Sequence, residues 1–104
     1  MVAVAQLIPR DPQEQASVLE VLRAHPELPD FIARASQKAE EVFANPLIHL
    51  DTVRYDEWDP PVRLVIEARM PFEDYDATVW RYIAELREKF EYPEDLILVF
   101  VQRR

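Results

Sequence analysis

The chain has 104 residues, the size of one domain, and 49% of them are hydrophobic, which is enough apolar material for a packed core. Twenty acidic residues against twelve basic ones give a formal net charge of −8, which argues against a nucleic acid as partner and is compatible with a basic protein. The absence of cysteine excludes disulfides and thiolate metal sites, and the absence of glycine excludes glycine-rich phosphate loops and the G-x-S-x-G elbow.

The N-terminal apolar run, residues 2–8, has no basic residue before it and stops at Pro9. It is too short for a signal-peptide core with its flanks or for a membrane span, so we expect a soluble cytoplasmic protein with no membrane partner. Within a single domain covering residues 1–104, we expect residues 1–10 to form an edge strand or a flexible tail.

Two helices are predicted next. Asp11 can cap a helix whose first position suits Pro12, and this helix is expected to run to about His25. Apolar residues at helical spacing predict a second helix from Pro29 to Ala44. Asn45-Pro46 ends it, because Pro disfavours helix in the residue before it and Asn tolerates the left-handed turn.

The second half of the chain predicts three strands and one helix. Leu47–Tyr55 and Val62–Met70 are predicted to be strands of an antiparallel hairpin. The second has the cleanest alternation of apolar and polar residues in the chain, with Val65 among the residues of its polar side. A helix is expected over Glu73–Phe90. The uninterrupted apolar run Leu96–Val101 is typical of a strand covered on both faces or buried in a dimer.

This order predicts an α+β fold with elements ααββαβ. We expect a small, mostly antiparallel sheet of three or four strands with the helices packed on one face. The last strand should run parallel to the second if the third helix crosses over the sheet.

The best candidate for chemistry is a polar cluster on the predicted hairpin. His49 and Asp51 leave the same face of the first strand, and Glu67 and Arg69 are expected opposite them on the second. His49, Asp51 and Glu67 together could hold a divalent metal or share a proton. The alternative, which we favour, is a solvated cross-strand face with ion pairs, so we predict no catalytic residue, no bound metal and no cofactor.

Candidate contact residues lie in the acidic, aromatic loop Tyr55-Asp56-Glu57-Trp58-Asp59. Tyr and Trp are typical interface anchors, so Tyr55 and Trp58 are predicted to contact a partner. Alternatively, Trp58 folds back over the edge of the sheet. Trp80, in the third predicted helix, is the remaining interaction candidate.

The middle of the chain, residues 28–90, combines Leu28-Pro29-Asp30-Phe31-Ile32, Ala39-Glu40-Glu41-Val42-Phe43 and the hairpin 47–70. In this pattern it resembles a loose group of small bacterial proteins. Some members are encoded beside PIN-domain ribonuclease toxins, which implies an antitoxin-like or accessory role. The chain departs from the pattern at residues 87–90, where an aromatic pair is expected, and at Asn45-Pro46, where a glycine is expected.

The sequence therefore predicts a non-catalytic protein–protein interaction domain. It would act as a homodimer or as the antitoxin-like or accessory partner of a basic protein. The alternative is a metal-dependent or hydrolytic enzyme that uses His49, Asp51 and Glu67.

Overall fold

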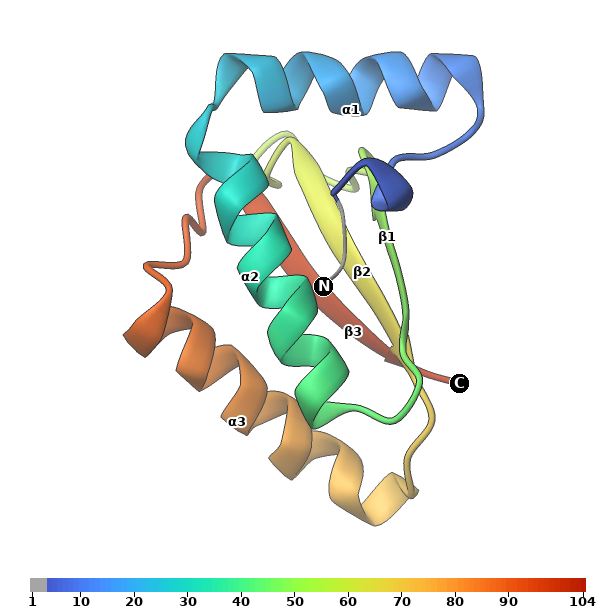
Figure 1. The fold of residues 1–104 in the computed structure, drawn as a ribbon, viewed down its shortest axis with the longest axis vertical. Helices are drawn as coiled ribbons and strands as arrows, with labels where there is room; N and C mark the ends of the chain where they lie inside the picture. Colours follow the sequence, from blue (N-terminus) through green and yellow to red (C-terminus); the bar gives the residue numbers. More distant parts are fainter. Residues whose placement is uncertain (1–3) are drawn as a thin grey trace.

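The computed structural model of the protein describes residues 4–104, and Figure 1 shows how its elements are arranged. They are, in chain order, a 3₁₀ turn η1 (Val4–Leu7), helices α1 (Pro12–Ala24) and α2 (Glu27–Val42), strands β1 (Leu47–Asp51) and β2 (Val62–Ala68), helix α3 (Phe72–Lys89) and strand β3 (Ile97–Arg103). This confirms the predicted α+β class and the order ααββαβ. Among the described residues, no helix combines the length and the apolarity needed to cross a membrane.

The two N-terminal helices form for the reasons that the sequence suggests. Helix α1 begins at Pro12 because the Asp11 carboxylate accepts a hydrogen bond from the Glu14 N–H at 3.1 Å. Helix α2 begins at Glu27 rather than at the predicted Pro29. Pro29 is tolerated in the first turn, where its missing N–H would have no partner within the helix. After α2, Asn45 takes the expected left-handed conformation with φ 46°.

The three strands form a mixed sheet in the order β1-β2-β3. β1 pairs antiparallel with β2, and β2 pairs parallel with β3, as the crossover through α3 requires. Strand β1 ends at Asp51 rather than at the predicted Tyr55. There the Asp51 side chain accepts a hydrogen bond from the Val53 N–H at 3.2 Å, and this local bond turns the chain out of the strand.

The hydrophobic core joins alternate residues of the sheet to the helices. The inward residues of β2 and β3 are Val62, Leu64, Ile66, Ala68, Ile97, Val99 and Val101, and all belong to one buried cluster. Helix α2 lies across the sheet in Figure 1 and adds Phe31, Ile32 and Ala35 to that cluster. The Tyr82 hydroxyl of α3 donates to the Ala35 carbonyl at 2.8 Å, which ties the two helices together.

The structure corrects the interpretation of the N-terminal run. Over its described part, Val4–Leu7 form a 3₁₀ turn instead of an edge strand, and Leu7 is buried in the core, so the segment is not a tail either. The turn packs beside β1, where an edge strand would have paired. It is held there by Leu7 and by Val4 and Ile8, which are partly buried against the same core. Residues 1–3 of the predicted edge strand or tail lie outside the described residues.

The structure also corrects the interpretation of the last strand. Ile97, Val99 and Val101 are buried, but Leu98 and Phe100 between them are 38% and 39% exposed. The prediction that this chain covers β3 on both faces is wrong. Burial of that second face in a dimer stays a prediction.

Candidate functional site

The side chains of the sheet that alternate with the core residues form a second surface, the outer face. Strand pairing arranges them in three rows, Leu47–Glu67–Gln102, His49–Val65–Phe100 and Asp51–Arg63–Leu98. Val65 in the centre is buried, whereas Leu98 and Phe100 are exposed. The outer face therefore carries exposed apolar side chains on β3 and the polar residues His49 and Asp51 on β1, with β2 between the two strands.

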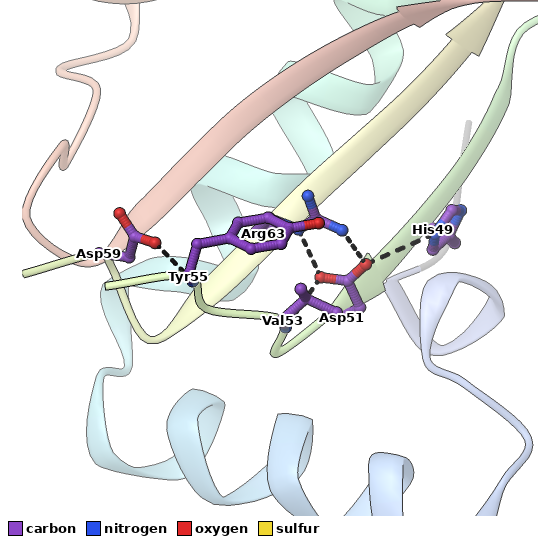
Figure 2. Close-up of polar contacts among 6 residues, drawn as sticks. All are labelled: His49, Asp51, Val53, Tyr55, Asp59 and Arg63. Atoms are coloured by element: carbon purple, nitrogen blue, oxygen red, sulfur yellow. Dashed lines mark hydrogen bonds and ion pairs between the residues drawn. The ribbon is translucent and has the colours of Figure 1, made fainter. Parts of the chain in front are cut away.

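Asp51 and Arg63 form the main polar contact of this face, as Figure 2 shows. Arg63 Nε donates to Asp51 Oδ1 at 2.7 Å and Arg63 Nη2 donates to Asp51 Oδ2 at 2.8 Å, which is a bidentate pair. His49 Nε2 lies 3.8 Å from Asp51 Oδ2, too far for a short hydrogen bond. The guanidinium carbon of Arg63 also lies 5.4 Å from the centre of the Phe100 ring.

The surroundings of Asp51 hold its carboxylate in the charged form. Partial burial acts to raise the pKa of Asp51, but the hydrogen bonds from Arg63 and from the Val53 N–H, with the Arg63 charge, outweigh it. The pKa of Asp51 is therefore lower than that of an ordinary aspartate. The charged Asp51 carboxylate serves as the ion-pair partner of Arg63, and it is poorly suited to take up a proton near neutral pH.

The predicted cluster of His49, Asp51 and Glu67 does not assemble. The strand register places Arg63, not Glu67, opposite Asp51, and Glu67 stands opposite Leu47. Within residues 4–104, no three His, Cys, Asp or Glu side chains are grouped so that they could hold a metal ion. The prediction that the three side chains meet is wrong, because Arg63 takes the position next to Asp51 that a third ligand would need.

The aromatic loop between β1 and β2 holds both of its aromatic side chains in solvent. Tyr55 is 86% exposed and Trp58 is 85% exposed. The alternative in which Trp58 folds back over the sheet edge is therefore wrong. Of the three predicted contact residues, these two lie together in one loop.

The backbone of this loop is fixed by its own side chains. Asp59 Oδ2 accepts hydrogen bonds from the N–H groups of Tyr55, at 2.8 Å, and Asp56, at 3.0 Å. Asp56 Oδ1 accepts one from the Trp58 N–H at 3.0 Å. Arg54 Nη2 donates to the Glu57 carbonyl at 2.6 Å. The acids of the loop thus hold the two aromatic residues in place, a role that their spacing in the sequence does not reveal.

A hollow of about 270 Å³ lies where the loop meets the outer face. Apolar and charged groups line it together: Val53, Tyr55, Asp56, Asp59, Pro60, Arg63, Leu98 and Phe100. Two of these, Leu98 and Phe100, come from β3. The sequence predicts that their apolar run is covered or buried in a dimer, but it does not show that these two residues adjoin the aromatic loop.

Trp80 belongs to a different surface. It lies on α3, is 70% exposed, and borders a shallow hollow of about 200 Å³ with Val79, Ile83 and Arg87. None of these residues lines the loop hollow. The structure therefore separates Trp80 from Tyr55 and Trp58.

Two side chains that sequence reasoning also missed block part of the free edge of β3. The Arg104 N–H donates to the Ala68 carbonyl. The backbone N–H and C=O groups of even-numbered residues of β3 therefore point toward β2, and those of odd-numbered residues point away from the sheet. On the outward side, the Val99 N–H donates to the Tyr92 hydroxyl at 2.7 Å. The Tyr75 hydroxyl donates to the Val101 carbonyl at 2.6 Å. Two tyrosines thus occupy backbone groups that another strand would need for pairing.

Comparison of the chain with protein-family models, with curated proteins and with solved structures found no match in any of the three.

Proposed function

We propose that this protein is a non-catalytic protein–protein interaction domain that binds its partner through the aromatic loop and the adjoining part of the outer face. The observation that carries the proposal is the exposure of Tyr55 and Trp58 on a loop that is already fixed by hydrogen bonds. Large aromatic side chains contribute most to binding when little conformational entropy is lost on contact.

The outer face supports this proposal. Leu98 and Phe100 are apolar and exposed beside the loop, so loop and strand together offer one continuous contact area. We place the three helices on the core side of the sheet, which leaves the outer face open to a partner. Stable interfaces usually bury about 800 Å² on each side, so a partner would have to cover the loop together with the strands.

The closed edge of β3 also supports a side-chain interface. Exposed strand edges bind other strands through backbone hydrogen bonds, with little selection among partners. Tyr75 and Tyr92 occupy that edge, so the outer face is the more available surface of β3. An antitoxin-like or accessory role, which the resemblance to neighbours of PIN-domain toxins implies, is one form that this function would take.

Site-specific photo-crosslinking tests the proposal. The amino acid p-benzoylphenylalanine replaces Trp58 in one variant and Ala16, an exposed residue of α1, in the control. In the cells that produce the protein, the variant with the crosslinker at position 58 should form an adduct with one partner, either another protein or a second copy of this chain. The variant with the crosslinker at position 16 should not form that adduct. The purified pair should then lose at least tenfold in affinity with Trp58→Ala.

Two outcomes contradict the proposal. The first is crosslinking at equal yield from positions 58 and 16, which would mark random collisions. The second is a purified complex whose affinity does not change with Trp58→Ala. Light scattering of the free protein at several concentrations separates self-association from binding of a different protein.

A further inference from the structure

We infer that the loop hollow receives an arginine or lysine side chain, and that the partner is therefore a basic protein distinct from this chain. This inference rests on the proposed function and names the chemistry of the partner. It follows from the walls of the hollow, from its charge and from the state of the chain's own basic residues.

The walls of the hollow suit a long aliphatic stem. Val53, Leu98 and Phe100 provide apolar surface, and Tyr55 provides an aromatic ring beside them. Arginine and lysine carry three or four methylene groups, which pack on apolar surface while the charged end stays near water. An aromatic ring at the mouth adds a cation–π contact, which stabilises a cation most when the site is partly desolvated.

The charge of the hollow suits a cation. Asp56 and Asp59 line it, and within the described residues their hydrogen bonds use only Asp56 Oδ1 and Asp59 Oδ2. The second oxygen of each carboxylate is therefore available to an incoming group. Arg63, the base that also lines the hollow, is already paired with Asp51 through two hydrogen bonds.

A second copy of this chain fits the hollow less well than a basic protein does. Two copies each carry a formal net charge of −8, so they repel each other at low ionic strength. The basic pair at the C-terminus already makes contacts within the chain. Arg103 lies 5.1 Å from the centre of the Phe72 ring, and Arg104 Nη2 donates to the Asn45 carbonyl at 3.2 Å.

Selection from a random dodecapeptide display library tests the inference. We expect the immobilised protein to enrich peptides with at least one Arg or Lys next to apolar residues. A synthetic copy of an enriched peptide should bind at least tenfold more weakly when its arginine is replaced by citrulline, which has nearly the same shape without the charge. Binding should also weaken as salt is raised from 50 to about 300 mM.

The protein variants make the test specific to the hollow. Asp56→Asn with Asp59→Asn removes two charges but keeps carbonyl oxygens that can accept the same backbone hydrogen bonds. We expect this double variant to lose at least tenfold in peptide affinity. Glu20→Gln with Glu40→Gln, at exposed positions of α1 and α2, changes the net charge equally and should lose less than twofold.

Each other outcome overturns the inference in a recognisable way. Enriched peptides that lack Arg and Lys, but that need Trp58, would overturn the inference and leave the proposed function standing. If the protein self-associates and the Asp56/Asp59 double variant does not, the partner is a second copy of this chain and not a basic protein. If no peptide depends on Trp58 and position 58 also fails to crosslink, both the inference and the proposed function are wrong.

Discussion

Strand β3 presents two surfaces to its surroundings: the backbone edge that faces away from β2, and the side chains of Leu98 and Phe100 on the outer face. The edge is occupied, because Tyr92 binds the Val99 N–H and Tyr75 binds the Val101 carbonyl. The outer face is not, since Leu98 and Phe100 are more than a third exposed. One strand thus has a closed surface and an open one.

The difference between the two surfaces separates two modes of association. Backbone pairing at an edge accepts almost any strand and favours aggregation, so small sheet proteins usually block it. Contact through side chains depends on shape and charge and can select a partner. We expect changes at the edge to affect stability and aggregation, and changes at the outer face and its loop to affect binding.

The largest effect is expected from Tyr92→Ala. The Tyr92 ring stacks on Phe31 of the core, with centroids 5.3 Å apart, and its hydroxyl accepts the Val99 N–H. Removing both should lower the free energy of unfolding by about 2–4 kcal/mol. Urea denaturation followed by circular dichroism measures this. Tyr92→Phe keeps the stacking and should lose only about 1 kcal/mol; equal losses in the two variants would contradict the assignment.

The next largest effect on stability is expected at the Asp51–Arg63 pair, the main polar contact of the outer face. Asp51→Asn removes the charge partner of Arg63 and should lower the free energy of unfolding by about 1–3 kcal/mol at pH 7. Because the pKa of Asp51 is lowered in the folded state, its contribution is complete above the ordinary aspartate pKa of about 3.9. It is lost as the pH falls through the lower folded value.

The pH dependence provides the check. Urea denaturation of wild type and Asp51→Asn should differ at pH 7, and the difference should shrink progressively below about pH 4. Asp30→Asn is a suitable control, because Asp30 pairs with Arg34 on the exposed surface of α2 and should contribute less than about 0.5 kcal/mol. A difference that is constant from pH 7 to pH 2 would show that the Asp51 charge is not responsible.

The parts of this architecture that depend on neighbouring residues could be predicted from the sequence. The Asp11 cap, the left-handed Asn45 and the alternation of β2 all follow from contacts within a few positions of the chain. The same holds for the order of the elements. These features need no knowledge of which strands pair or in which register.

The parts that depend on distant residues could not be predicted. Which residue of β2 faces Asp51 is set by the strand register, and the ten-residue loop between the strands leaves that register open. The apolar run of β3 predicts a strand but not how many of its faces are covered. The partners of Tyr75 and Tyr92 are backbone groups of a strand that only the crossover brings beside them.

A smaller effect on stability is expected from opening the edge alone. Tyr75→Phe combined with Tyr92→Phe removes two hydrogen bonds and keeps both rings, so unfolding should become easier by about 1–2 kcal/mol in total. The Val99 amide should exchange its hydrogen faster, and the mass measured by light scattering should rise with concentration. Tyr55→Phe, with its ring in solvent, is the control. A double variant with unchanged mass and exchange would mean that the tyrosines do not guard the edge.

The smallest effect on stability, and the one that separates the two surfaces most sharply, is expected from Tyr55→Ala with Trp58→Ala. Both side chains are exposed, so the free energy of unfolding should change by less than about 0.5 kcal/mol. Binding of the selected basic peptide should nevertheless fall at least tenfold, because Tyr55 lines the hollow and Trp58 is exposed in the same loop. Trp80→Ala, a change at a side chain of α3 that is 70% exposed, should leave peptide binding unaltered. A loss of stability without a loss of binding would reverse the assignment and make the loop a structural element.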